Sequence, residues 1–248
     1  MLNLVFCIIP KDHYFDHDVP NLKELKEEFF DHTDLILHEP EMRPKTGVFA
    51  QLRYQSVHQR WMTELLVRID QTKTSVVSAC IDKFALSRRY AYPFDPYDLT
   101  IRFCLERTRQ FLALNHQAHR RTQVIFESRV KRHDRAAQIE FQRILTRTNL
   151  LGHHQPHFSR FPIEPLSISK QSNLAGHQRC NLLARPLAKW SFDRNSHQRP
   201  MQIIQTKLIA HKVFPHTGWQ RPTRSGLNPY FNEYTRVNPS ANDSHAPR

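Results

Sequence analysis

The apolar positions along the chain follow two periods, one typical of helices and one typical of buried strands. After Pro20, three apolar side chains fall on one face of a helix, at Leu22, Leu25 and Phe29. Three more segments show the same spacing and are predicted to be helices, at residues 57–69, 96–112 and 139–145. Asp95 followed by proline is a typical start for the second of these.

Short apolar runs between these helices are predicted to be strands. They read NLVFCII near the N-terminus, then DLILHE, TSVVSACI and QVIFE. Strands that alternate with helices at this spacing predict an α/β fold. The pattern weakens in LGHHQPHFSRFP and recovers in LSISK, AGHQRCNLLARPLAKW and MQIIQTKLI, where Pro186 is expected to kink or end the second segment. Residues 1–214 are therefore expected to form one domain, and the polar residues 215–248 a flexible basic tail.

The composition is that of a globular, basic protein. Apolar residues make up 39% of the 248 positions, and 36 Lys and Arg face 23 Asp and Glu, which gives a net charge of +13. Electrostatics favours nucleic acid and other polyanions as partners, although such a surplus also serves plain solubility. No run reaches the length of a membrane span, and the N-terminus lacks the features of a secretory signal. A cytoplasmic location without a membrane partner is expected.

Cysteine and histidine give no metal signature. The four cysteines are far apart and show neither zinc spacing nor a dense disulfide framework, at Cys7, Cys80, Cys104 and Cys180. The sixteen histidines include two clusters, one at residues 13–17 and one at residues 153–157. Neither cluster has a known ligand spacing, so both are expected to be solvated loops.

Glu127 is the first candidate for chemistry. It ends the apolar run Val124–Phe126 and is followed at once by basic residues. One interpretation is an ion pair to Arg129 or Lys131 at the rim of the sheet. The other is a metal or catalytic ligand, because sites in open α/β sheets lie beyond the carboxyl ends of strands.

Several segments resemble, in order, the bacterial family called domain of unknown function 3800. They read KDHY, LHEPEMR, YAYPFDPYDLTIRFCLERTRQFL, VIFESRVKRHD, KQSNLAGHQRCNLLARPLAKW and HKVFP, and they extend from Leu4 to Pro215. The resemblance implies a ribonuclease-H-like fold, with a central mixed sheet flanked by helices. It also implies a carboxylate cluster suited to a divalent metal.

Carried over by position, the family's acidic residues fall on Glu41, in LHEPEMR, and on Glu127, in FESR. The resemblance makes both catalytic candidates and ligands for Mg²⁺ or Mn²⁺, which prefer oxygen donors. Arg129 and Lys170 would then orient phosphate or, in the alternative, pair with the same glutamates. The rim of the site would be formed by Ser172, Asn173 and Gln178.

Three departures from the family pattern weaken this site. Family members begin with a strand that ends in Asp-Glu-Ser-Gly, and this chain starts after it, so the first strand is expected to be missing. Asn181 stands in the catalytic position where GLQLADLVARP has aspartate, and an amide does not balance a dication. His177 and Arg179 replace apolar residues. Mg²⁺ or Mn²⁺ is therefore expected to bind weakly.

Three functions remain open at this point. The first is a relative of metal-dependent phosphodiester hydrolases that is impaired or inactive. The second is a protein that binds nucleic acid without cleaving it. The third is a decaying gene product without activity.

Overall fold

The computed structural model describes residues 1–89, 95–128, 131–146, 161–193, 199–214 and 219–220. The strands are β1 (Leu2–Ile8), β2 (Ser75–Ile81), β3 (Thr122–Glu127), β4 (Ile163–Ile168), β5 (Leu208–Phe214) and β6 (Trp219–Gln220). The α-helices are α1 (Lys11–His13), α2 (Val19–Phe30), α3 (Glu39–Met42), α4 (Gln55–Gln71), α5 (Lys83–Arg89), α6 (Pro96–Leu114), α7 (Lys131–Thr146), α8 (Ala175–Phe192) and α9 (Arg199–Lys207). A π-helical turn, η1 (Tyr14–Asp18), and two 3₁₀ segments, η2 (Gly47–Arg53) and η3 (Lys170–Ser172), complete these elements.

The strands form two sheets. The larger has the order β1-β2-β5-β6, in which β1 and β6 run antiparallel to their neighbours and β2 is parallel to β5. The smaller consists of β3 and β4 in parallel. The predicted α/β fold, with a mixed sheet and flanking helices, is confirmed. Among the described helices, none combines the length and apolar character that crossing a bilayer requires.

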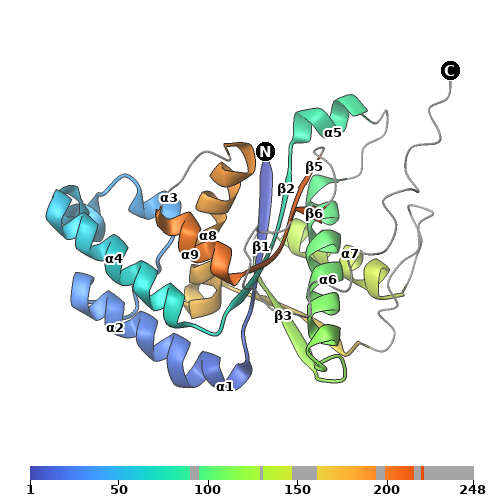
Figure 1. Ribbon diagram of the computed structural model, residues 1–248, viewed down its shortest axis with the longest axis horizontal. Coiled ribbons are helices and arrows are strands. Elements are labelled where there is room, and N and C mark those ends of the chain that lie inside the picture. Colours follow the sequence, from blue (N-terminus) through green and yellow to red (C-terminus); the bar gives the residue numbers. More distant parts are fainter. Residues whose placement is uncertain (90–94, 129–130, 147–160, 194–198, 215–218, 221–248) are drawn as a thin grey trace.

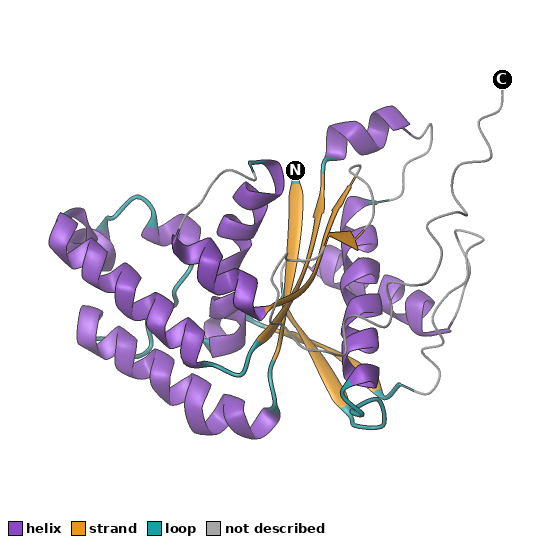
Figure 2. Cartoon of the chain, in the orientation of Figure 1, coloured by secondary structure: helices purple, strands orange, loops and turns teal. Residues whose placement is uncertain are grey.

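Helices cover both faces of the larger sheet, as Figure 1 shows. Helices α2, α4, α8 and α9 lie on one side, and α6 and α7 lie on the other; Figure 2 shows the strands between these two groups. Each side has its own apolar core. Trp61, Leu183 and Leu187 belong to the first, and Ile101 and Phe141 belong to the second.

Strand β1 contributes to both cores because successive side chains point to opposite faces. Val5 is buried in the first core, while Leu4 and Phe6 pack against the second. The Phe6 ring also meets Phe126 of β3 edge-on, with ring centroids 6.2 Å apart. This contact joins the larger sheet to the smaller one.

One local prediction is wrong. DLILHE does not form a strand, because the Leu37 N–H donates to the Gln178 side chain (2.9 Å) and α3 begins at Glu39. Of the two effects expected of Pro186, a kink or an end, the helix does not end there, since α8 continues to Phe192. Leu187 and Trp190, just beyond the proline, are buried in the first core and hold this part of the helix.

The predictions for residues 153–157 and for most of residues 215–248 lie outside the described residues. Within the latter range, Trp219–Gln220 form β6, which pairs with β5.

Candidate functional site

The candidate residues gather around the carboxyl ends of β3 and β4. Because these strands are parallel, Glu127 and Ile168 end them side by side, and the Ser128 N–H donates to the Ile168 carbonyl (2.8 Å). The segment η3 begins two residues later, at Lys170. We call this region the carboxyl edge, meaning Glu127, Lys170 and the residues of α3 and α8 that contact them.

Glu41 is held at the carboxyl edge by two potential cations. Its carboxylate accepts a hydrogen bond from the Lys170 ammonium and lies 3.1 Å from Nδ1 of His38. Hydrogen bonds from Lys170 first, and then from His38, lower the pKa of Glu41. Lys170 thus forms an ion pair with a candidate glutamate, which was the alternative to a phosphate contact. A metal ion would have to displace this ammonium to reach the carboxylate.

Glu127 faces an amide of α8. Asn181 Nδ2 donates to Glu127 Oε2 over 3.5 Å, which is long for a hydrogen bond. Glu127 and Asn181, two of the three catalytic candidates, are therefore neighbours. The pair offers one carboxylate and one neutral amide, which together balance only part of a dication's charge.

His177 lies one helical turn before Asn181 and contacts the outer edge of β3. Even-numbered residues of β3 bond to β4, so the backbone groups of Ile125 face the other way, where they meet the His177 imidazole. Burial lowers the pKa of His177, which favours the neutral ring. Its Nε2 is buried and has no hydrogen-bond partner among the described residues.

Gln178 and Asn173 belong to a structural network. Gln178 is only 2% exposed, so its predicted place on a solvent-facing rim is wrong. Its oxygen accepts from the Leu37 N–H, and its amide donates to Asn173 Oδ1 (2.6 Å). The same Asn173 oxygen accepts from Lys26 Nζ (3.0 Å), and burial lowers the pKa of Lys26 to about 8. These polar atoms are satisfied within the protein, which fixes the turn between η3 and α8.

The structure describes one of the other two predicted substrate contacts. Ser172 is exposed in η3, where its N–H donates to the Ser169 carbonyl (3.0 Å). Arg129 lies outside the described residues.

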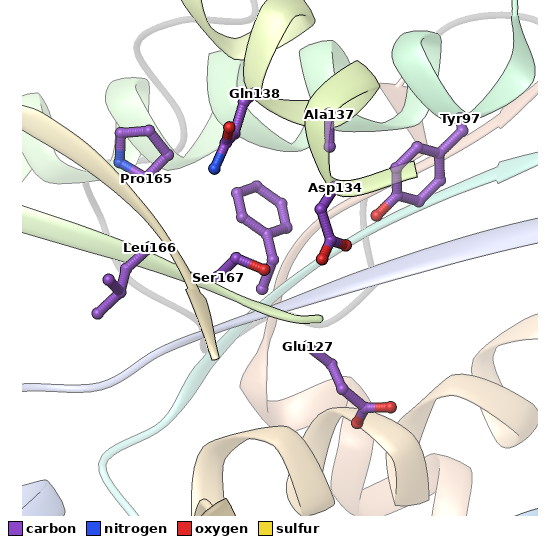
Figure 3. Close-up of a pocket in the computed structure, with 9 residues that line it drawn as sticks. Tyr97, Glu127, Asp134, Ala137, Gln138, Pro165, Leu166 and Ser167 are labelled. Carbon is purple, nitrogen blue, oxygen red and sulfur yellow. The ribbon is translucent and has the colours of Figure 1, made fainter. Parts of the chain in front are cut away.

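A small pocket lies behind Glu127, between β3, β4 and α7 (Figure 3). Its free volume of about 20 Å³ suits a single water molecule. Asp134 lines it and accepts a hydrogen bond from Ser128 Oγ (2.6 Å), while the Glu127 carboxylate points away from Asp134. Ser167 Oγ is buried at the pocket without a hydrogen-bond partner among the described residues.

The donor set does not form a ready metal centre. Within the part of the chain that the structure describes, no three His, Cys, Asp or Glu side chains lie close enough to share an ion. The two carboxylates that were predicted to bind metal already have protein partners, a lysine for Glu41 and an amide for Glu127. These residues fit a divalent cation poorly.

A shallow groove runs along the exposed face of α7 and was missed by the sequence analysis. Its lining includes two exposed arginines and two glutamine side chains, at Arg135, Gln138, Gln142 and Arg143, with Pro165 of β4 on the other side. Gln138 and Pro165 also line the pocket behind Glu127, so the groove leads to the carboxyl edge. Spacings of three and four residues place Arg135, Gln138 and Gln142 on one helical face, with Arg143 next to them, and that polar stripe was the available signal.

Comparison with family models, curated proteins and solved structures found no match for this chain. The resemblance to the unknown-function family therefore depends on the sequence segments alone.

Proposed function

We propose that this protein binds nucleic acid along its basic half and does not cleave it efficiently. The observation that carries this proposal is the state of the two candidate carboxylates. Lys170 neutralises Glu41, and Asn181 faces Glu127. The edge therefore lacks the cluster of free carboxylates with which a hydrolase would hold a metal ion.

The distribution of charge along the chain supports a polyanion as the partner. Residues 91–248 carry 24 Lys and Arg against 10 Asp and Glu, whereas residues 1–90 carry 12 against 13. The second half contains β3, β4 and the helices α6 to α9. Phosphate groups would be drawn to this half, because each neutralised phosphate releases condensed counterions.

The groove on α7 is the part of this surface that best fits a phosphate backbone. Arg135 and Arg143 are exposed and two helical turns apart, and Gln138 and Gln142 between them add neutral donors. Two helical turns span about 11 Å, so the two guanidinium groups contact phosphates that are not adjacent on one strand.

The framework that we propose is ribonuclease-H-like. Among the described strands, β1 pairs only with β2 and β3 pairs only with β4, yet Phe6 of β1 touches Phe126 of β3. A strand placed between β1 and β3 would unite the two sheets. This is where the family resemblance expects the strand that ends in Asp-Glu-Ser-Gly.

The proposal is tested by fluorescence anisotropy with labelled single-stranded DNA, duplex DNA and an RNA–DNA hybrid. We expect binding that weakens by about tenfold or more between about 50 mM and about 200 mM salt. The double variant Arg135→Gln and Arg143→Gln should weaken it further at low salt. The matched control is Lys11→Gln with Lys23→Gln, because both lysines are exposed on the near-neutral half.

Two outcomes would contradict the proposal. Absence of binding at low salt would mean that the charge serves solubility only. Equal losses in the two double variants would show that the groove on α7 is not the contact surface.

A metal-dependent phosphodiester hydrolase is the second candidate. It is favoured by the position of Glu127 at a strand end, beside a pocket that also contains Asp134. Incubation of the same nucleic acids with Mg²⁺ or Mn²⁺ separates the two functions. Cleavage that Glu127→Ala abolishes would establish the hydrolase.

A further inference from the structure

The first histidine cluster, at residues 13–17, forms a helical segment and not the solvated loop that the sequence predicted. His13 Nε2 accepts a hydrogen bond from the Lys73 N–H (2.9 Å), in the loop between α4 and β2. The same nitrogen lies 3.4 Å from Asp18 Oδ1. We propose that His13 is a pH-sensitive switch, which holds the Lys73 loop when neutral and binds Asp18 when protonated. The proposal is independent of nucleic-acid binding.

The π-helical turn η1 explains why one nitrogen has two partners within reach. In a regular α-helix, residues that are five positions apart point to different sides. The wider turn of η1 brings Asp18, five positions after His13, to the same side. It also places His17 against the His13 ring, with the ring centroids 4.8 Å apart. A regular helix would leave Lys73 as the partner and Asp18 out of reach.

The structure shows the neutral form of His13. A backbone N–H donates to a lone pair, so Nε2 carries no proton and the ring proton lies on Nδ1. Asp18 is 0% exposed, and its Oδ2 accepts from Arg179 (2.6 Å). Its Oδ1 has no hydrogen-bond partner among the described residues. A buried carboxylate oxygen without a donor is costly, and an N–H beside it would remove that cost.

Protonation reverses the role of His13 Nε2. An imidazolium has an N–H on both nitrogens, so Nε2 accepts no hydrogen bond and the Lys73 N–H loses its partner. The new Nε2–H then donates to Asp18 Oδ1, which a small movement of the ring brings into hydrogen-bond range. One proton is taken up from solvent, to which 11% of the His13 side chain is exposed. The contact between α1 and the loop before β2 is therefore exchanged for an ion pair within the helical segment.

The charged and titratable groups around His13 favour its neutral form at neutral pH. They are Asp18 and His17 from its own segment, Lys73 from the loop and Arg179 from α8. Burial first lowers the pKa of His13 below the ordinary value of 6.5; Asp18 opposes this shift, and the other three groups add to it. The folded state thus binds this proton less tightly than the unfolded state. Stability from the His13–Lys73 contact is present above pH 6.5 and is lost as the pH falls through the lower, folded-state pKa.

The test follows the Lys73 amide by two-dimensional NMR of the full chain as the pH falls from about 8 to about 5. We expect its chemical shift to titrate in one step below pH 6.5. His13→Gln should abolish the step, because the glutamine oxygen accepts the same N–H and does not titrate. His17→Gln is the matched control and should keep the step, at a slightly higher pH because a neighbouring positive charge is lost.

Urea unfolding gives a second readout. Between about pH 7 and about pH 5, the unmodified protein should lose more stability than His13→Gln, because only the unmodified protein has a contact that titrates there. Groups such as Asp98 titrate in both proteins, so their effect cancels in the comparison. A Lys73 amide shift that does not change with pH, a step that persists in His13→Gln, or a step that disappears in His17→Gln would overturn the proposal.

Discussion

The contact between Asn181 and Glu127 makes Asn181 the most informative single residue for metal chemistry. Replacement by aspartate, Asn181→Asp, removes the donor and places a second carboxylate within about the same distance of Glu127. Two carboxylates without a cation repel each other, and a dication relieves that repulsion. We expect the affinity for Mn²⁺ to rise by about tenfold in calorimetric titration, from weak binding in the unmodified protein.

The control for this prediction is Gln202→Glu, which makes the same change of charge on the exposed face of α9. Equal gains in Mn²⁺ affinity in both variants would show that net charge, and not the position of the new carboxylate, causes the effect. Tight binding by the unmodified protein, abolished by Glu127→Ala, would show that Asn181 is no defect.

Ionisation of Asp98, at the start of α6, lowers the stability of the folded protein, so this loss of stability depends on pH. Burial first, and then the nearby Glu140 and Asp95 carboxylates, raises its pKa to about 6. The folded state therefore holds this proton more tightly than the unfolded state, so stability falls as the pH rises from about 4 to about 6. Because Asp98 is partly exposed, solvent screening reduces the cost to about 1 kcal/mol above that range.

Asp98→Asn should recover about this amount at pH 7 and nothing near pH 4. Urea unfolding at both pH values measures it, with the exposed Asp12→Asn as the control. A gain that is equal at both pH values would contradict the titration of Asp98 as its cause.

Arg179 joins three elements through a buried ion pair. Its guanidinium bonds to Asp18 of η1, which is 0% exposed, and to Thr74 just before β2. The sequence analysis noted Arg179 as a polar residue where packing was expected, and the structure supplies its partner. Arg179→Met should destabilise the protein by about 3 kcal/mol or more, because Asp18 is left buried without its cation.

A double variant separates this cost from the loss of the arginine itself. Adding Asp18→Asn to Arg179→Met removes the stranded charge, so urea unfolding should show much of the stability restored. The same loss in the single and double variants would mean that packing of the arginine stem, and not the charge, sets the cost.

Elements in which apolar residues recur at regular spacing were predictable from sequence. Elements that depend on a contact with a residue far away in the sequence were not. The apolar spacing of residues 57–69 predicts α4 because one side of that helix is buried against a single core. DLILHE has the composition of a strand, but its Leu37 N–H is satisfied by Gln178, which is 141 positions away. No local pattern reports that hydrogen bond.

The same limit applies to the site. Glu127 could be found from sequence because it ends an apolar run, whereas Asn181 was selected only through the family resemblance. The Lys170 ion pair to Glu41 was foreseen only as one of two alternatives, because charge alone does not choose between phosphate and carboxylate.

At the scale of the whole molecule, the proposed strand between β1 and β3 makes a direct prediction. A chain extended before Leu2 by a strand that ends in Asp-Glu-Ser-Gly, combined with Asn181→Asp, should join the two sheets and supply the absent carboxylates. We expect cleavage of nucleic acid with Mg²⁺ or Mn²⁺ from this combination, and none from Asn181→Asp alone. The measurement is a gel assay on single-stranded, duplex and hybrid substrates.

The extended chain also has a structural readout that does not depend on activity. Amide hydrogen exchange should show new protection at Ile125, whose backbone faces the outer edge of β3. Unchanged exchange at this residue would mean that the added strand does not enter between β1 and β3.

The division of β1 between two cores has a consequence for the order in which the protein folds during synthesis. The first core needs Leu187 and Ile204, and β2 needs its parallel partner β5, all of which leave the ribosome long after β1, α2 and α4. Until then α2 and α4 can pack against each other, through Phe29, Phe30 and Trp61, but the rest of their apolar faces has no partner. The nascent chain must therefore wait with exposed apolar surface, a condition in which chaperones bind and in which premature release favours aggregation.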